Sequence, residues 1–242
     1  MTHPVCGEDI VLRELSGIVE MQRSEAFQIE AWGEGEKPDN ADILMALQSE
    51  GGLVAGAFRG EEMLGFLLGF PTVTPGLQHS HRLAVKSNLR GLGLGAKLKW
   101  FQRDWCLARG VTTVRWTYDP LRAVNAGLNI GVLGAVVRDY HVDYYGAMPG
   151  MNAGLPSDRV MAIWQLDSDR VRDRVEAGGA TMLQQEIPQE VHIPRDIDAL
   201  LAEDPEAALA QRLRVRAALQ KAFNAGRQIV GFDKARCSYQ LA

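Results

Sequence analysis

The chain has 242 residues, of which 46% are hydrophobic and 23% charged, and its formal net charge is −4. This composition is typical of a globular chain that can build one sizeable core, or a core with an extension. The mild negative charge argues against nucleic acid as the main partner, and the sequence contains neither an apolar run of the roughly 20 residues that cross a bilayer nor a signal-peptide pattern.

The three cysteines, Cys6, Cys106 and Cys237, are far apart in the sequence and form no Cys-x-x-Cys pair. An odd number of widely spaced cysteines favours reduced, partly buried thiols over a disulfide framework or a zinc site. We therefore expect a cytoplasmic protein without a bound metal.

Hydrophobic periodicity and turn residues predict the following elements. In chain order they are a strand at 10–15, helices at 19–32 and 42–50, strands at 53–58, 63–70 and 81–85, a helix at 93–109, a strand at 111–117, a helix at 119–132, and strands at 136–145 and 159–166. Asp119 and Pro120 are expected to form the N-cap and first turn of the last of these helices. This order predicts a mixed, partly parallel sheet with helices on both faces, an α/β fold.

From residue 167 onward the sequence becomes more charged and less apolar. It predicts a helix at 167–176, a short strand at 187–194, a helix at 204–224, and a closing hairpin of strands at 228–232 and 236–241. We therefore expect a core domain, 1–166, and a C-terminal extension, 167–242, that packs on it. Arg212, Arg214 and Arg216 are interpreted as a solvated helix face rather than a nucleic-acid stripe, because acidic residues lie nearby.

Residues 79–95 are the most informative stretch, because a short strand, a turn and a glycine-rich helix start follow one another there. A helix start presents unpaired backbone N–H groups and the positive end of the helix dipole, which together attract anions. Gly91, Gly93 and Gly95 allow a bulky anion to approach the main chain, and Arg90 adds a positive charge. The stretch therefore predicts a phosphate-bearing ligand.

Three phosphate-loop patterns compete for this stretch. The sequence lacks the Gly-x-x-x-x-Gly-Lys-Ser/Thr run of nucleoside triphosphate loops. The dinucleotide pattern Gly-x-Gly-x-x-Gly fits only loosely, and no acidic residue follows about 20 positions later in a second parallel strand. The third pattern, Arg/Gln-x-x-Gly-x-Gly/Ala, fits at Arg90, Gly93 and Gly95, and it resembles the pyrophosphate loop of the GNAT superfamily of acyl-CoA-dependent N-acyltransferases.

The predicted order of elements is also similar to the GNAT topology across about residues 8–166. The resemblance implies a GNAT-like fold and acetyl-CoA or another acyl-CoA as co-substrate. It places the pyrophosphate of coenzyme A on Arg90, Gly91, Leu92, Gly93, Leu94, Gly95 and Ala96, and the pantetheine arm along Leu83, Ala84 and Val85. It also places Asn125 or Asn129 near the pantetheine amides; the alternative for these residues is capping or a buried amide.

His79 and His81 are two residues apart in a predicted strand, so their side chains should share a face. The run His-x-His-x-Leu-Ala-Val resembles the arylalkylamine acetyltransferase branch, in which paired histidines serve amine deprotonation. An alkylammonium must lose a proton before it can attack a thioester, and imidazole is suited to accept it. We therefore predict His79 and His81 as catalytic residues; the alternative is a pair of histidines on a wet surface.

The resemblance implies a tyrosine acid in the helix after the fifth strand, but Ile130 occupies that position. Tyr140, Tyr144 or Tyr145 could substitute, although tyrosines on strands more often serve packing. Arg159 and Arg138 are candidates to bind a substrate carboxylate through forked hydrogen bonds, with salt bridges to Asp139 or Asp158 as the alternative. Tyr144 is a further candidate substrate residue.

His79-Ser80-His81, the segment from Asp119 to Ala126, and Ser157-Asp158-Arg159 together resemble an uncharacterised bacterial GNAT subgroup associated with N-acylamino acid metabolism. This resemblance implies amino acids as acceptors and allows succinyl-CoA as donor. We expect direct transfer to a small-molecule amine without a covalent acyl-enzyme, since Cys106 lies in a packed helix. Neither nucleic acid nor membrane is expected as a partner, and a homodimer is left open. The alternative function is a catalytically silent acyl-CoA-binding regulatory module.

Overall fold

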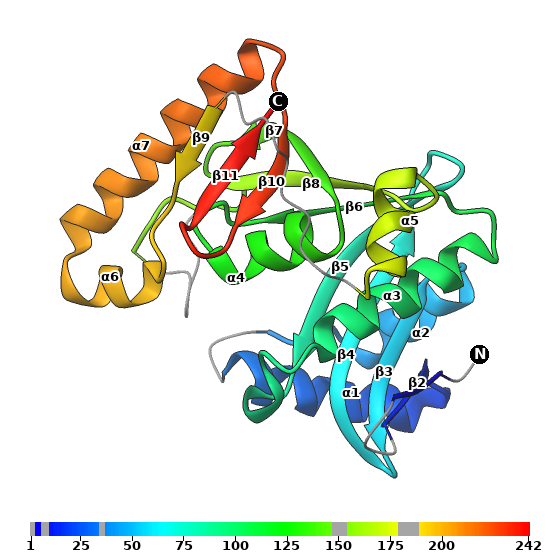
Figure 1. The fold of residues 1–242 in the computed structure, drawn as a ribbon. Helices are drawn as coiled ribbons and strands as arrows, with labels where there is room; N and C mark the ends of the chain where they lie inside the picture. The colour runs from blue at the N-terminus through cyan, green and yellow to red at the C-terminus, as the bar shows by residue number, and fades with distance from the viewer. Residues whose placement is uncertain (1–2, 6–9, 34–36, 147–153, 179–188) are drawn as a thin grey trace. The chain divides into compact units, whose positions relative to one another are not determined.

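A computed structural model describes residues 3–5, 10–33, 37–146, 154–178 and 189–242 of the chain (Figure 1). Its residues divide into two compact units, 1–114 and 115–242. No helix in these described ranges is both long enough and apolar enough to cross a membrane. Cys6 lies outside the described residues, whereas Cys106 and Cys237 are buried free thiols.

The first unit is built on an antiparallel sheet whose strands follow one another in chain order, β1-β2-β3-β4-β5. These strands are His3–Val5, Ile10–Glu14, Leu53–Arg59, Glu62–Pro71 and Leu77–Val85. The unit's helices are α1 (Gly17–Trp32), α2 (Ala41–Ser49) and α3 (Leu94–Leu107), and the short 3-10 turn η1 (Ser87–Leu89) precedes α3.

Helices cover both faces of this first sheet (Figure 1). On one face, Met21 and Phe27 of α1 and Leu44 of α2 pack in one buried cluster with Val54 and Phe66 of β3 and β4. On the other face α3 lies so close to β4 that a Cβ added at Gly65 would come within 2.8 Å of the Leu98 side chain. The sheet is therefore buried on both faces, which explains the nearly continuous apolar sequence of β3 and β4.

The second unit continues from β6 (Thr113–Tyr118), and its strand order is β6-β8-β7-β10-β11-β9. The strands after β6 are β7 (Val136–His141), β8 (Arg159–Gln165), β9 (Gln189–His192), β10 (Ile229–Asp233) and β11 (Ser238–Leu241). The helices are α4 (Ala123–Ala126), α5 (Asp169–Glu176), α6 (Ile197–Glu203) and α7 (Pro205–Asn224), and a π-helical turn, η2 (Gly127–Val132), follows α4.

The predicted extension is built into this second unit. Strand β10 pairs with β7 through Ile229 and Val137, and the hairpin β10–β11 pairs with β9, so these late strands extend the β7–β8 ladder. The predicted division between a core domain and an extension at 166/167 stays a prediction. The two compact units of the structure divide at 114/115.

Three sequence expectations differ from the structure. The helix expected from Asp119 begins only at Ala123, because Asp119 forms a turn in which its carboxylate accepts the Leu121 N–H at 2.8 Å. Strand β7 ends at His141 rather than 145, since the chain turns at Asp143, whose φ is 47°. Helix α6 was not predicted at all. The strand expected at 187–194 corresponds to β9 (Gln189–His192). Residues 187 and 188 of the expected strand lie outside the described ranges.

Candidate functional site

The loop between β5 and α3 shapes the main chain for an anion. Gly91 and Gly93 have φ angles of 80° and 83°, and Gly93 is the N-cap of α3. Side chains disfavour this left-handed region, so glycine is the residue that fits. Because α3 begins at Leu94, the first-turn amides from Leu94 to Ala96 have no acceptor within the helix. The helix start therefore presents main-chain donors together with the positive end of its dipole.

Two of the predicted coenzyme-binding residues on β5, Leu83 and Val85, face Gly95 at the start of α3. A Cβ added at Gly95 would lie 3.8 Å from both the Leu83 and the Val85 side chains. Ala84 faces the opposite way, into the cluster formed with α1 and α2, so it offers only main-chain atoms. Arg90 differs from expectation: its Nη2 donates to the main-chain oxygen of Ala31 at 2.8 Å, near the end of α1.

The two histidines gather over one phenylalanine. The ring centroid of His79 lies 5.1 Å from that of Phe70, the His81 ring lies 5.9 Å from it, and the two imidazoles are 6.2 Å apart. A bulge produces this arrangement, because Leu68 of β4 pairs with Arg82 while its neighbour Gly69 pairs with Ser80. His81 is thus an extra residue in β5, and such bulges re-aim side chains.

Asp39 lies beside this histidine pair, and the sequence reasoning missed it. Its Oδ1 is 3.7 Å from Nε2 of His81, and its Oδ2 is 3.0 Å from Nε of Arg82. Arg82 is held in turn by the main-chain oxygen of Lys37 at 3.1 Å and by the face of the Trp32 ring. The imidazole of His81 therefore lies next to a fixed carboxylate while remaining 38% exposed.

A buried polar network lies on the opposite face of β5, towards α3. Nζ of Lys99 donates to Gln102 at 2.6 Å and to Ser80 at 3.1 Å, and Gln102 donates to Gln78 at 2.6 Å. Burial lowers the pKa of Lys99 to about 7. Burial also raises the pKa of the Cys106 thiol to about 12. A thiol held in its protonated form is a poor nucleophile.

The remaining predicted residues lie in the second unit. Asn125 is half-buried on α4 and Asn129 is buried in η2, as is Ile130, which stands in the position of the expected tyrosine. Arg138 is exposed on β7, and Tyr144 is 47% exposed with its ring against Tyr145.

Tyr140 and Arg216 both donate hydrogen bonds to the carboxylate of Asp158. The Tyr140 hydroxyl donates to its carboxylate at 2.6 Å, and Arg216 donates two hydrogen bonds at 2.8 Å. Burial opposes ionisation of Asp158, but the hydrogen bonds from Arg216 and Tyr140 hold the pKa of this carboxyl below its usual value. Arg159 instead donates to the main-chain oxygen of Asp158 at 2.9 Å and lies over the Tyr145 ring.

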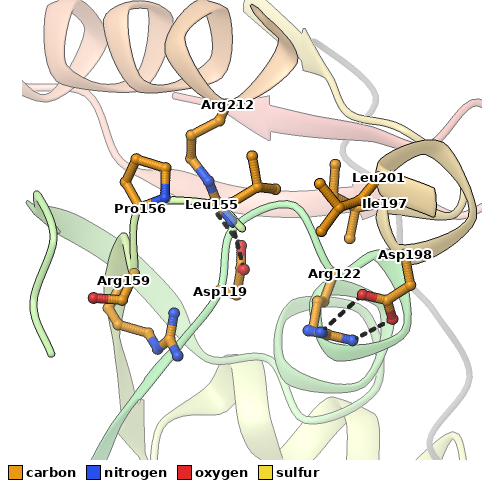
Figure 2. Close-up of a pocket in the computed structure, with 10 residues that line it drawn as sticks. Asp119, Arg122, Leu155, Pro156, Arg159, Ile197, Asp198, Leu201 and Arg212 are labelled. Atoms are coloured by element: carbon orange, nitrogen blue, oxygen red, sulfur yellow. Dashed lines mark hydrogen bonds and ion pairs between the residues drawn. The ribbon is translucent and has the colours of Figure 1, made fainter. Parts of the chain in front are cut away.

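Arg159 also lines a pocket of the second unit (Figure 2). The opposite wall carries Arg212 of α7, which is 2% exposed and donates to both carboxylate oxygens of Asp119. The interpretation of Arg212 and Arg216 as a solvated face was therefore wrong. Their spacing of four residues, on the helix face that also buries Ala208, Val215 and Leu219, is the signal that could have revealed them.

The predicted residues thus form two sets, one in each unit. Within the described residues, no group of three or more His, Cys, Asp or Glu side chains is arranged to hold a metal ion.

Residues 16–126 match the model of the acetyltransferase (GNAT) family. No curated protein matches the sequence. Solved structures of 16–17% identity share the fold. One is the ribosomal-protein-S18-alanine N-acetyltransferase from Escherichia coli, with 16% identity, a TM-score of 0.54, and coverage of 74% of this chain and 99% of that one.

Two further similar structures are yncA from Salmonella typhimurium, a putative acetyltransferase solved with acetyl-CoA, and an IAA acetyltransferase from Bacillus cereus. The first is 17% identical with a TM-score of 0.52, covering 66% of this chain and 95% of that one. The second is 16% identical with a TM-score of 0.50, covering 64% and 99%. These likenesses and the family match confirm the predicted GNAT-type α/β fold, and the family supports acyl transfer from an acyl-CoA.

Proposed function

We propose that this protein is a cytoplasmic N-acyltransferase that moves an acetyl or other acyl group, succinyl included, from acyl-CoA to a small-molecule primary amine such as an amino acid. The observation that carries the proposal is the start of α3. There the left-handed glycines Gly91 and Gly93 and the first-turn amides make a main-chain anion site directly after the strand that bears two histidines. The GNAT family match across this segment supports coenzyme A as the anion.

In this proposal the diphosphate of coenzyme A binds the amides at the start of α3, and the pantetheine arm extends along β5 at Leu83 to Val85. Residues 90–96 form the cradle. Arg90 contributes indirectly, because its bond to Ala31 ties the loop to α1. In the second unit, Asn125 and Asn129 are the proposed contacts for pantetheine amides.

His79 or His81 acts as the general base. The acceptor ammonium gives one proton to an imidazole, and its nitrogen lone pair attacks the thioester carbonyl carbon. The carbon–sulfur bond breaks to release the CoA thiolate, and the nitrogen loses its second proton, which the thiolate takes up. His81 is the stronger candidate, because Asp39 stabilises the imidazolium that forms. Transfer is direct, since the buried and protonated Cys106 is unsuited to carry the acyl group.

The acceptor is proposed to be bound through its carboxylate by Arg159, with Arg138 and Tyr144 as further candidate contacts. Buried Ile130 favours a second candidate function, a silent acyl-CoA-binding regulatory module, because no hydroxyl is present where the resemblance implies an acid. A thiolate is a good leaving group, so the absence of this acid does not prevent transfer.

One experiment separates the two functions. The protein is incubated with acetyl-, propionyl- or succinyl-CoA and a panel of free amino acids and arylalkylamines, and free thiol is followed over time. Amine-dependent thiol release, with the N-acyl product identified by mass spectrometry, is the expected result. Tight CoA binding without amine-dependent release across the panel would favour the regulatory module, and no CoA binding at all would exclude both.

A further inference from the structure

Four polar side chains are buried between β5 and α3, in a layer that is otherwise apolar. We call them the Lys99 network; they are Gln78 and Ser80 of β5 and Lys99 and Gln102 of α3, and none is more than 5% exposed. Nζ of Lys99 donates to Gln102 at 2.6 Å and to Ser80 at 3.1 Å. The Ser80 hydroxyl donates to the same Gln102 oxygen at 3.3 Å. Every buried nitrogen and oxygen atom of these side chains has a hydrogen-bond partner.

A lysine at this place is costly for the fold. Burial lowers the pKa of Lys99 to about 7, although Cys106 acts on it in the opposite direction. An apolar side chain of similar volume would fill the same space without this cost, so stability alone does not account for the network. A buried network whose members all have partners holds its surroundings in one arrangement.

The network also contacts β4, at Gly69, which is the residue paired with Ser80 across the sheet. A Cβ added at Gly69 would come within 2.5 Å of Oε1 of Gln78 and 2.8 Å of Nε2 of Gln102. Glycine therefore leaves the space that the network occupies. A slip that placed a neighbouring β4 residue opposite Ser80 would bring a side chain into this space, so the network ties Ser80 to one register.

The extra residue of β5 lies between two anchored points. Before it, Ser80 faces α3 and is bonded to Lys99; after it, Leu83 faces α3 at Gly95. Side chains of a regular strand alternate between its faces, so residues three positions apart share a face only if one residue between them is extra. That extra residue is His81.

We propose that Lys99 is a positioning residue for the histidine pair. Its hydrogen bond to Ser80 fixes the bulge at His81, and the bulge in turn brings both imidazoles over Phe70. Lys99 lies on the other face of β5 from the imidazoles, so it acts through the main chain. Its effect on catalysis rests on the proposed function, whereas its effect on the position of the imidazoles does not need turnover.

The test is an NMR measurement on the full chain, without any CoA compound or acceptor. It follows the ring protons of His79 and His81, assigned with the variants His79→Gln and His81→Gln. Protons above an aromatic ring are shifted upfield, so Phe70→Leu provides the reference for imidazoles that have lost this ring. The shifts are compared at the alkaline end of a pH titration, where both imidazoles are neutral, so that a change in their pKa does not imitate a change in position.

Two substitutions break the same hydrogen bond from its two ends, Lys99→Met and Ser80→Ala. Lys97→Met, on the same helix but outside the network, is the matched control. Ser80→Thr is the conservative variant, because it keeps the hydroxyl that accepts from Lys99.

The expected result is a selective movement of the imidazole signals. In Lys99→Met and Ser80→Ala the His81 signals should move towards their values in Phe70→Leu. The His79 signals should move less, because this residue stays opposite Phe70. The control Lys97→Met should leave both sets unchanged, and the threonine variant should restore the wild-type signals.

A role in stability alone would lower the free energy of unfolding and leave the imidazole signals of the folded protein in place. Unmoved signals in Lys99→Met and Ser80→Ala therefore overturn the proposal, as does an equal movement in Lys97→Met. A threonine variant that behaves like Ser80→Ala would assign the effect to packing and also overturn it. If one network variant fails to fold, the other decides; failure of both would make the network a requirement for folding and not a positioning device.

The activity measurement comes after an acceptor has been identified. Lys99→Met should lower kcat several-fold and leave the KM for acyl-CoA within about twofold, since the coenzyme cradle is untouched. Moved imidazole signals in a protein that transfers no acyl group would keep the positioning role and remove the proposed function. Acyl transfer by a protein whose imidazole signals stay in place in both network variants would do the reverse.

Discussion

The guanidinium of Arg212 donates two hydrogen bonds to the carboxylate of Asp119, at 2.7 and 2.6 Å, across 93 residues of sequence. The two side chains are 2% and 10% exposed, so water screens this pair little. Helix α7 is thereby fastened to the turn after β6. Such a pair differs from the many surface ion pairs of the chain, because loss of one partner leaves a buried charge without compensation.

Substitution of Arg212 is therefore expected to destabilise the second unit strongly. Arg212→Met should lower the free energy of unfolding by about 3–5 kcal/mol, because the Asp119 carboxylate stays buried. Arg172→Gln, which breaks the exposed Arg172–Asp169 pair, is the control and should cost less than about 1 kcal/mol.

Urea denaturation of the two single variants measures this difference. The double variant Arg212→Met with Asp119→Asn should recover part of the loss, since the second change neutralises the stranded charge while keeping the acceptor for the Leu121 N–H. A cost for Arg212→Met as small as that of Arg172→Gln would contradict the structural assignment.

Buried Lys99 should make the stability of the first unit depend on pH. Its pKa is about 7 in the folded chain, against 10.5 for an ordinary lysine. Between these values the unfolded chain binds one more proton than the folded chain, so this residue makes stability rise with pH, by up to about 1.4 kcal/mol per pH unit. Urea denaturation at pH 7.5 and 8.5 should show the rise in the wild-type protein and a shallower one in Lys99→Met.

Lys97→Met, on the same helix, is the control for a general effect of lysine removal. The comparison is made below pH 9 because of Cys106, whose pKa burial raises to about 12 in the folded chain. Once its thiol ionises in the unfolded chain, Cys106 makes the stability fall with pH and so opposes the effect of Lys99. Parallel pH curves for the wild-type protein and Lys99→Met would mean that Lys99 is charged in the folded state at these pH values.

Substitutions of the two glycines at the start of α3 should affect the stability of the fold and the affinity for acetyl-CoA differently. Gly93→Ala should cost about 1 kcal/mol in stability, because φ is 83° there, and should also weaken acetyl-CoA binding. Gly95→Ala lies inside the helix with its new methyl 3.8 Å from Leu83 and Val85, an ordinary contact, so the fold should be as stable or slightly more stable.

Isothermal titration with acetyl-CoA then tests the proposed position of the ligand. If the pantetheine arm passes between this helix start and β5, Gly95→Ala should bind about tenfold more weakly despite its intact fold, since a methyl displaces ligand atoms from a close approach. Unchanged affinity in both glycine variants would place the coenzyme elsewhere.

The histidine pair should carry the base function. Once an acceptor is identified, His79→Ala and His81→Ala are compared, and loss of the base should lower kcat by about 10²-fold or more. Asp39→Asn keeps the shape of the side chain beside His81 but removes its charge, so we expect a smaller, several-fold loss in kcat with little change in the KM for acyl-CoA. Asp42→Asn, an exposed change at the start of α2, is the control. Full turnover in both alanine variants would remove the histidines from the mechanism.

Local sequence signals located most elements of the fold. Each of these signals acts within a few residues, so it can be recognised along the chain. Examples are the glycines around the β3–β4 hairpin and the start of α3, Asp204-Pro205 at the start of α7, and the alternation of more and less buried residues in β6. The element order and the glycine loop together were enough to indicate the GNAT fold.

The residues whose roles differ from the sequence-based expectation have their partners far away in the sequence. Asp119 was assigned as a helix cap because the residues after it are typical of one, but a distant arginine and a local turn use its carboxylate. Asp39 carries no motif that relates it to His81, and the arginines of α7 have partners in other elements. Pairings of this kind are decided by the tertiary fold, so no pattern within a window of sequence predicts them.

The inserted residue in β5, His81, changes which residues of the strand face α3. Before it, Gln78 and Ser80 face α3, and after it Leu83 and Val85 do. Deletion of His81 would restore regular pairing, with Ser80 and Arg82 still opposite Gly69 and Leu68, and it would leave His79 opposite Phe70 without the second imidazole. Designed shortening of this strand by that one residue should therefore eliminate the histidine cluster in a protein that still folds.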